Sequence, residues 1–516
     1  MKNRFIKASG DNRVDSLLSG TKWGEESVGS AVNLTFSIPD GSTFWSYTEE
    51  ANAGFSTLSG AQRDHFRSAL NAWAEVTQLT FTEVPDSTAY GDIRIAYTQL
   101  ITGNTQAYAY LPGTGSYIGD IITPSAQAGD IWVNPSLTDL SPTSTGYATM
   151  LHEIGHALGL KHSFEAESGF PAIYPAYDNT QYTVMSYTDY QGAGYIFTDL
   201  GATQYTYREV MPTTPMLYDI LAAQYMYGVD TKTRTGNDVY TFTTSAELKT
   251  IWDAGGIDEI DLSNQNIAAN LNLTAGTFSD IGQRQMTYDG PLSQAQDNIA
   301  IAFGVVIENV TGTRFNDNLM GNSADNQIKG GEGNDLIDGG DGSDTARFEG
   351  ERSSYRVIKD DQGIVTVEGE DGRDTLQNIE KLAFDDGSFA LTYLLSAIET
   401  VIPTQKSEVN LTPAEQDTAY FLLDIGSAQT QDVSVHYTTR DGSARAGQDY
   451  VAASGTATIS AGQTHLAIAI NLIDDSVIED SETFSLIVTN PVGGEFADNA
   501  VELVAQRTIV DNDTIA

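Results

Sequence analysis

The stretch TMLHEIGHALGLKHS, residues 149–163, holds three of the six histidines of this 516-residue chain. On a helix His152 and His156 share one face, with Glu153 beside the first. Gly159 can take the left-handed conformation that ends a helix, so that His162 can fold back toward the other two. Three nitrogen ligands leave a fourth position open for water, as in catalytic zinc sites. We therefore predict that these three histidines bind Zn²⁺ and that Glu153 is the general base.

The alternative is a helix that binds no metal. H-E-x-x-H alone can arise by chance, but the full pattern H-E-x-x-H-x-x-G-x-x-H fixes many more positions and favours the zinc site. The other histidines, His65, His436 and His465, stand alone in the sequence and are expected to be structural or solvated.

The composition excludes several classes of protein. The chain has 70 acidic and 26 basic residues and a net charge of -44. Such a chain repels nucleic acid and anionic membranes and favours cations, Ca²⁺ in particular. It has no cysteine, which excludes disulfides, thiolate zinc sites and cysteine catalysis. No run approaches the roughly 18 apolar residues of a membrane-spanning helix, and no Sec-type signal peptide is visible.

The length indicates about three domains. Residues 1–235 are expected to form a mixed α and β domain. Three of its segments have helical periodicity and three have the character of strands. The helical segments are 59–76, 147–158 and 215–228, and the strands are 79–84, 92–98 and 129–135.

Residues 236–399 are rich in Gly, Asn and Asp and contain a repeat. Four consecutive nonapeptides, from GTRFNDNLM (312–320) to GGDGSDTAR (339–347), follow the pattern G-G-x-G-x-D-x-U-x, in which U is a large apolar residue. Each supplies a turn that can bind Ca²⁺ and a short strand that buries one apolar side chain. We predict a parallel β-roll that folds only with Ca²⁺, because so little apolar surface cannot offset chain entropy. The expected ligands are Asp317, Gly330, Gly331, Gly333, Asp335, Gly339, Gly340, Gly342 and Asp344.

Residues 400–516 are expected to form an all-β sandwich. Four segments alternate between apolar and polar residues and are separated by turn residues. They are 432–439, 455–460, 465–473 and 483–489.

The histidine motif resembles the zinc site of a metzincin protease. Metzincins carry a tight turn with a methionine below the metal, and YTVMSYTDY (182–190) would supply it with Met185. In astacin-like and serralysin-like members a tyrosine two residues later, here Tyr187, ligates the resting zinc and stabilises the oxyanion. The calcium repeats favour the serralysins, and nothing suggests the disulfides of an astacin-like protease.

The resemblance to serralysins covers about residues 15–395. It implies a secreted zinc endopeptidase that cuts proteins and peptides with broad specificity. The strand GDIWVN (129–134) would be the edge strand that pairs with substrate, through Ile131, Trp132 and Val133. In IWDAGGIDEIDLS (251–263) family members bind Ca²⁺, which assigns Asp253, Gly255, Asp258 and Asp261 as ligands.

Further expectations concern export and partners. The missing Sec signal and the repeats resemble substrates of the type I secretion machinery. A short pro-segment within about the first 15 residues, a monomeric state, and no binding to nucleic acid or insertion into membranes are also expected.

The C-terminal segments 441–464 and 474–491 resemble a Calx-beta domain. Five acidic residues match positions that can bind Ca²⁺ there, and the sequence weighs this equally against solvated loop acids: Glu415, Asp449, Asp474, Asp475 and Glu482. A rival for the whole chain is a calcium-dependent adhesin with an inactive protease-like domain. The intact zinc ligands, base and tyrosine argue against it.

Overall fold

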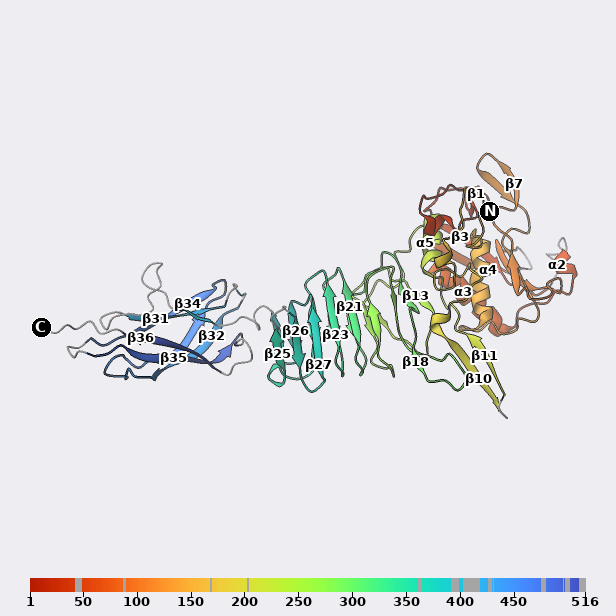
Figure 1. The fold of residues 1–516 in the computed structure, drawn as a ribbon. Coiled ribbons are helices and arrows are strands. Elements are labelled where there is room, and N and C mark those ends of the chain that lie inside the picture. The colour runs from red at the N-terminus through yellow and green to blue at the C-terminus, as the bar shows by residue number, and fades with distance from the viewer. Residues whose placement is uncertain are drawn as a thin grey trace. The chain divides into compact units, whose positions relative to one another are not determined.

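The computed structural model describes most of the chain, in two compact units, Met1–Glu332 and Gly333–Ala516 (Figure 1). The described residues are 1–41, 49–86, 90–167, 169–201, 204–359, 364–390, 399–401, 418–425, 429, 431–474, 479–494, 496 and 502–509. No helix within these ranges is long and apolar enough to cross a membrane.

A five-stranded sheet and three helices form the centre of the first unit. The sheet order is β4 (Leu79–Glu83), β3 (Val32–Ser37), β5 (Ile93–Tyr97), β9 (Asp130–Val133) and β6 (Ala107–Ala109). The first four strands are parallel and β6 is antiparallel to β9. The helices are α3 (Gly60–Ala74), α4 (Thr145–Leu158) and α5 (Leu217–Tyr227). These elements confirm the helical and extended segments predicted here, with Phe66, Leu70 and Trp73 of α3 buried as its periodicity requires.

The predicted edge strand is wrong. Strand β9, with Ile131, Trp132 and Val133, lies between β5 and β6, and all three side chains are buried. Its backbone therefore pairs with a strand on each side, with β5 and with β6, and β6 is the last strand of the sheet. The continuous apolar character of IWV is typical of an internal strand rather than an edge.

The first residues are part of a second sheet of this unit. Its order is β2 (Thr21–Trp23), β1 (Asn3–Phe5), β8 (Ile121–Pro124) and β7 (Gly115–Ile118), so that β1 pairs on both sides. Smaller elements are α1 (Asn12–Asp15), α2 (Glu49–Asn52), η2 (Pro175–Tyr177), η3 (Gln191–Ala193) and the hairpin of β10 (Tyr195–Gly201) and β11 (Gln204–Glu209).

Short parallel strands continue the first unit to its end. In one sheet β12 (Val239–Tyr240), β14 (Glu259–Asp261), β20 (Asn309–Thr311) and β22 (Gln327–Lys329) pair in parallel, and in another β15 (Asn270–Asn272) pairs with β21 (Asn318–Asn322). Apolar residues stack in register, as in Ile260, Val310 and Ile328. The remaining strands are β13 (Lys249–Ile251), β16 (Phe278–Ser279), β17 (Gln283–Arg284), β18 (Ser293–Gln294) and β19 (Ile299–Ile301).

The second unit begins with strands of the same kind. Strand β23 (Leu336–Gly340) pairs in parallel with β27 (Arg373–Gln377), and β24 (Thr345–Arg347) with β28 (Lys381–Phe384). The elements η4 (Arg352–Ser354), β25 (Arg356–Lys359), β26 (Val365–Glu368) and β29 (Gly387–Ala390) accompany them. The eighth residue of each predicted repeat is completely buried, which confirms its inward direction: Leu319, Ile328, Ile337 and Ala346.

GEDGRDTLQ (369–377) is a further copy of the repeat that the sequence analysis missed. Its eighth residue, Leu376, pairs with Ile337, and Gly372 bridges to Gly333 at the same repeat position. The copy was missed because residues 348–368 separate it from the consecutive four.

The rest of the second unit consists of antiparallel strands. One sheet has the order β30 (Glu399–Val401), β31 (Thr418–Asp424) and β34 (His465–Asn471). The other has the order β33 (Ser454–Ile459), β32 (Val433–Asp441), β35 (Glu482–Val492) and β36 (Glu502–Ile509). Both sheets contribute to one hydrophobic cluster, for example through Phe421 and Phe484. The four predicted strands are all present.

Candidate metal centre and active site

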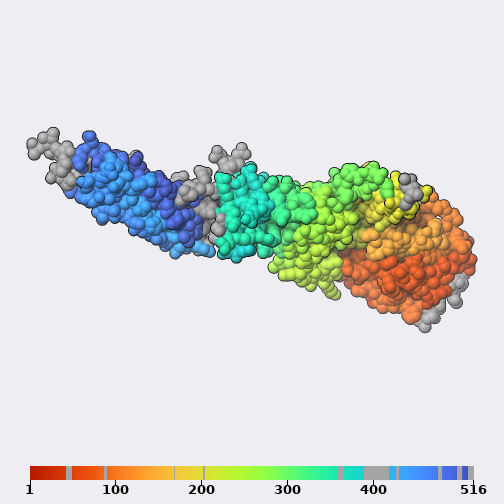
Figure 2. Space-filling view, turned by 90° about the horizontal axis from the view of Figure 1, so that it is seen from below, coloured from red at the N-terminus to blue at the C-terminus, as the bar shows by residue number. Residues whose placement is uncertain are grey.

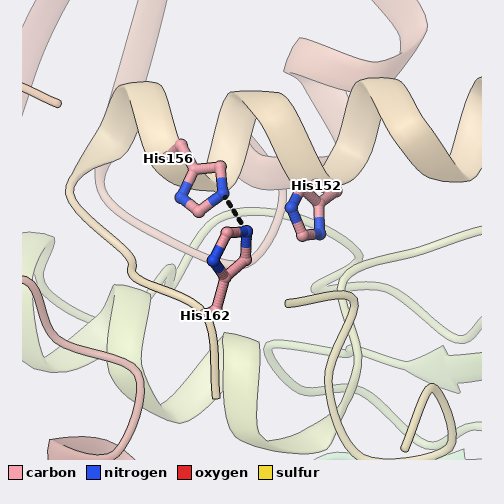
Figure 3. A group of neighbouring side chains, drawn as sticks. All are labelled: His152, His156 and His162. Atoms are coloured by element: carbon pink, nitrogen blue, oxygen red, sulfur yellow. Dashed lines mark hydrogen bonds between the residues drawn. The ribbon is translucent and has the colours of Figure 1, made fainter. Parts of the chain in front are cut away.

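Helix α4 and the segment after it bring three imidazole rings together. His152 and His156 project from one face of the helix, and His162 points back at them from the returning chain (Figure 3). One ring nitrogen of each histidine lies within 4.8 Å of those of the other two. The helix begins at Ser144, whose side chain accepts a hydrogen bond from the Tyr147 N–H. It ends at Gly159.

Gly159 is required for the return of the chain. Its φ of 112° lies in the left-handed region. A Cβ there would also lie 2.3 Å from the carbonyl oxygen of Thr21. Any larger residue would be strained and would collide with β2, so the turn that returns His162 depends on this glycine.

A buried lysine fixes the segment that carries His162. Lys161 is 2% exposed, and its ammonium donates hydrogen bonds to four carbonyl oxygens, those of Ser16, His162, Glu165 and Pro171. Burial lowers the pKa of Lys161 to about 8. The sequence analysis did not single out this residue, although it precedes the third histidine directly.

The hydrogen bonds of the three rings test whether the site fits a metal. Nδ1 of His152 lies 2.6 Å from the carbonyl oxygen of Val184, and Nδ1 of His156 lies 2.8 Å from that of Leu160. Nδ1 of His162 lies 3.0 Å from a carboxylate oxygen of Glu165. Since these oxygens can only accept, each Nδ1 carries the hydrogen and each Nε2 of a neutral ring presents a lone pair.

Two of these lone pairs face each other. Nε2 of His156 lies 3.1 Å from Nε2 of His162, the contact dashed in Figure 3. They repel unless a cation or proton lies nearby, and burial keeps His156 neutral by lowering its pKa well below the usual value. The donor set therefore fits a divalent cation, and three imidazole nitrogens suit zinc.

Glu153 follows His152 on α4 and is almost completely buried. It is 4% exposed, and its Oε2 has no hydrogen-bond partner within the described part of the chain. Burial raises the pKa of Glu153 to about 8. A buried carboxyl group without partners binds a proton readily, as a general base must.

Tyr187 contacts His152 and His162 of the same centre. Its hydroxyl donates a hydrogen bond to Nε2 of His162 over 2.7 Å, and its side chain is 68% exposed. Desolvation and the charge of Glu153 raise the pKa of Tyr187, so the hydroxyl keeps its proton. The geometry thus makes it a hydrogen-bond donor at the metal centre.

The turn beneath the centre contains Met185 and is held by Asp219. Met185 is completely buried, and a Cβ on Gly155 would lie 2.7 Å from its sulfur, so the methionine packs against α4 between the two histidines. Asp219 accepts hydrogen bonds from Thr183 Oγ1, the Val184 N–H and the Met216 N–H. Since the Val184 carbonyl accepts from His152, Asp219 also helps to orient that ring. The sequence analysis missed Asp219, whose only signal is its place at the start of α5.

A cleft of about 780 Å³ contains His152, Glu153 and Tyr187. Residues 104–107, which lead into β6, lie along it, whereas Ile131, Trp132 and Val133 do not. Residues of the opposite lining come from the turn after Met185 and from β11 and the chain beyond it: Ser186, Asp189, Tyr207, Arg208, Glu209, Met211 and Pro212.

A first carboxylate group lies among the short strands of the first unit. Carboxylate oxygens of Asp238, Asp253 and Asp258 lie within 4.8 Å of one another. Asp258 is fully buried, and its Oδ2 has no hydrogen-bond partner among the residues described. Gly255 donates its N–H to Asp253. Asp261 lies outside the group and accepts from the Ser263 N–H, and Asp238 was not predicted.

The repeat aspartates are buried in their glycine turns. Asp317 is 3% exposed and accepts from the Thr313 N–H, the Thr313 hydroxyl and the Ala269 N–H. Asp335 and Asp344 are equally buried. Of the glycines assigned as ligands, Gly331, Gly333, Gly340 and Gly342 have positive φ, whereas Gly330 and Gly339 do not.

Another carboxylate group lies in the second unit. It combines Asp449 and Glu482, which were predicted, with Glu479, which was not. Asp474 is exposed and lies outside the group. Glu415 and Asp475 fall outside the residues that the structure describes.

Family models match three regions of the chain, of which the second and third overlap. Residues 45–198 match Matrixin, residues 218–451 match Peptidase M10 serralysin C terminal, and residues 399–513 match the Calx-beta domain. The fold and the histidine site thus lie in a region similar to the Matrixin peptidases, followed by a region similar to the serralysin C terminus. The resemblance to the serralysins, and to a Calx-beta domain, is confirmed.

The chain is similar to named serralysins over part of its length. It is 35% identical to Serralysin C of Dickeya chrysanthemi over 329 residues, which are 58% of this chain and 60% of that protein. It is 33% identical to Serralysin of Proteus mirabilis over 326 residues, 57% of this chain and 60% of that one. The similarity thus spans about 60% of the length of these relatives. The crystal structure of the apo-form Calx CBD1 domain is 30% identical over 20% of this chain and 89% of its own, with a TM-score of 0.18.

Proposed function

We propose that this chain is a secreted zinc-dependent endopeptidase of the serralysin type, with broad specificity for protein substrates and stabilised by calcium. The observation that carries the proposal is the convergence of three imidazole lone pairs next to the buried carboxyl group of Glu153, where His152 and Glu153 line a cleft. Residues 1–235 are the catalytic domain, 236–399 a parallel β-roll, and 400–516 a Calx-beta-like sandwich.

The side chains divide the work of peptide hydrolysis. His152, His156 and His162 hold the zinc ion, which when bound polarises the scissile carbonyl group and lowers the pKa of water. Glu153 takes a proton from the attacking water at its carboxylate and delivers it to the leaving amine. Tyr187, whose hydroxyl already points into the centre, donates a hydrogen bond to the oxyanion.

Substrate binding uses β6, the last strand of the five-stranded sheet. An extended peptide pairs with the free edge of β6, beside the cleft residues Gln106 and Ala107. Recognition through backbone hydrogen bonds depends little on side chains, which accounts for broad specificity.

A casein-clearing assay with and without a zinc chelator tests the proposal. We expect the zinc-loaded chain to clear casein, the chelated chain to lose essentially all activity, and added Zn²⁺ to restore it. If the zinc-loaded chain leaves casein intact while calcium-dependent binding to a surface persists, the adhesin alternative is correct. Clearing that continues in protein without zinc would exclude the metal mechanism.

Calcium completes the proposal. The group Asp238, Asp253 and Asp258, the repeat turns, and the group Asp449, Glu479 and Glu482 each hold Ca²⁺. Without Ca²⁺ the buried carboxylates repel one another, and with it binding energy becomes folding energy. Low cytosolic Ca²⁺ then permits export of an unfolded monomer by type I machinery, and folding follows outside.

Asp258→Asn tests the first of these groups. Loss of one buried charged ligand should raise the Ca²⁺ concentration at the folding midpoint by at least about tenfold, equivalent to about 1.4 kcal/mol. The measurement is circular dichroism of the full chain, titrated with Ca²⁺ after chelation. Asp261→Asn is the matched control, because Asp261 lies outside the group, and its midpoint should equal that of the unchanged chain. Equal midpoints for both variants would remove Asp258 from the ligand set.

A further inference from the structure

The hairpin of β10 and β11 carries an aromatic face. Side chains alternate along a strand, and the register pairs Phe197 with Tyr207 and Asp199 with Tyr205. Tyr195, Phe197, Tyr205 and Tyr207 therefore share one face of the hairpin, where ring centroids of neighbouring residues lie 5.5–6.1 Å apart. We call these four residues the aromatic face.

This face is exposed although the hairpin is anchored. Tyr207 is 61% exposed and Tyr205 is 46% exposed. The hairpin projects from the first unit in Figure 1, and residues near position 200, yellow in Figure 2, lie at the surface. Tyr288 stacks on Tyr205 with centroids 4.1 Å apart, and the Tyr195 N–H donates to the Gln285 carbonyl over 2.9 Å. Exposed aromatic residues on an anchored support mark an interaction site rather than a loose loop.

The aromatic face is continuous with the cleft. Tyr207, Arg208 and Glu209 of β11 belong to the lining of the cleft that contains His152, Glu153 and Tyr187. A strand rises about 3.4 Å per residue, so Tyr205 lies about 7 Å along the strand beyond Tyr207. The aromatic surface thus extends the cleft by the length of about two residues of extended polypeptide.

We propose that the aromatic face binds a segment of the protein substrate that lies outside the cleft. The segment is extended and rich in apolar, aromatic or proline residues, because aromatic faces stack on such side chains and on polyproline-like backbone. Asp199 and Glu209 border the face, so acidic segments are disfavoured. This inference rests on the proposed protease function and adds a second contact through which long substrates are selected.

Peptides of two lengths test the inference with the zinc-loaded chain. A short fluorogenic peptide fills only the cleft. Two longer peptides carry about six further residues at either end, one set containing Phe, Tyr and Pro and the other only Gly and Ser. We expect the apolar extension at one end to lower KM by about two- to tenfold, the range of one or two aromatic contacts, with kcat unchanged. The Gly and Ser extension should leave KM unchanged.

Variants of the hairpin separate binding from folding. Tyr205→Ala should lose the gain in KM, and Tyr205→Phe should keep it, because the ring rather than the hydroxyl makes the contact. Thr206→Ala is the matched control: Thr206 is exposed, follows Tyr205 on β11 and pairs with Thr198 on the opposite face of the hairpin, so this variant should keep the gain. Because β11 also lines the cleft, unchanged kinetics on the short peptide show that the hairpin is still folded.

Several results would overturn the inference. One is equal KM for short and extended peptides. Another is a loss in Tyr205→Ala as large for the short peptide as for the long one, which would make Tyr205 a structural part of the cleft wall. Binding to a polysaccharide that depends on Tyr205, without any gain for extended peptides, would make the face a carbohydrate platform. Failure of the zinc-loaded chain to cut even the short peptide would instead refute the protease function.

Discussion

Glu153→Gln is expected to lower kcat/KM by about 10²- to 10⁴-fold, the usual contribution of a general base. Glutamine preserves the volume of this buried side chain but cannot accept a proton from water. The measurement is the rate of peptide cleavage together with zinc content determined by elemental analysis. Because the three histidines are hydrogen-bonded to Val184, Leu160 and Glu165 rather than to Glu153, zinc content and melting temperature should stay unchanged.

The activity and the zinc content of Glu153→Gln together distinguish a general base from a residue that supports metal binding. A variant that has lost zinc along with activity would show that Glu153 supports the metal rather than the chemistry. A variant that keeps more than about a tenth of the original kcat with zinc bound would show that another group is the base.

Tyr187→Phe is expected to lower kcat by a factor that corresponds to about 2.7–4 kcal/mol, the cost of one oxyanion donor in a serine protease. KM should change little, since the hydroxyl acts mainly in the transition state. The ring keeps its contacts with His162 and Phe164, so packing is preserved. Steady-state kinetics with the short peptide measure both constants.

Tyr190→Phe is the matched control for this variant. Tyr190 lies three residues further along, donates its hydroxyl to the Gln296 carbonyl, and is not part of the cleft lining. Loss of the Tyr190 hydroxyl should leave kcat unchanged. If Tyr187→Phe cleaves at the same rate as Tyr190→Phe, Tyr187 is a packing residue and the oxyanion has another donor.

The cluster of three histidines could be predicted from the sequence because its geometry is local. A four-residue step on a helix and a glycine that reverses the chain place three rings together, whatever the rest of the fold is. The inward residue of each repeat was predictable for the same reason. The pattern recurs every nine residues, so the buried position can be recognised without knowing which distant segments pair.

The order of strands was not local and could not be predicted. Strand β6 consists of three small or aromatic residues, Ala107–Ala109. Nothing in this short segment predicts that it pairs with β9. Asp238 and Glu479 complete their groups with aspartates that are distant in sequence, Asp253 and Asp258 for the first and Asp449 for the second. The hairpin did leave a signal, the alternation of Tyr195, Phe197, Tyr205 and Tyr207 around Gly201, which the sequence analysis overlooked.

The four carbonyl oxygens around Lys161 imply an order in which contacts form during folding. One comes from Ser16 and the others from residues 162, 165 and 171, so they meet only when segments 145 residues apart have come together. Contacts of such sequence separation form late, because closing a long loop costs entropy before any contact compensates for it. The third imidazole is therefore fixed at the end of domain assembly. We expect zinc to bind only after this step. An incompletely folded chain would then not cleave other proteins.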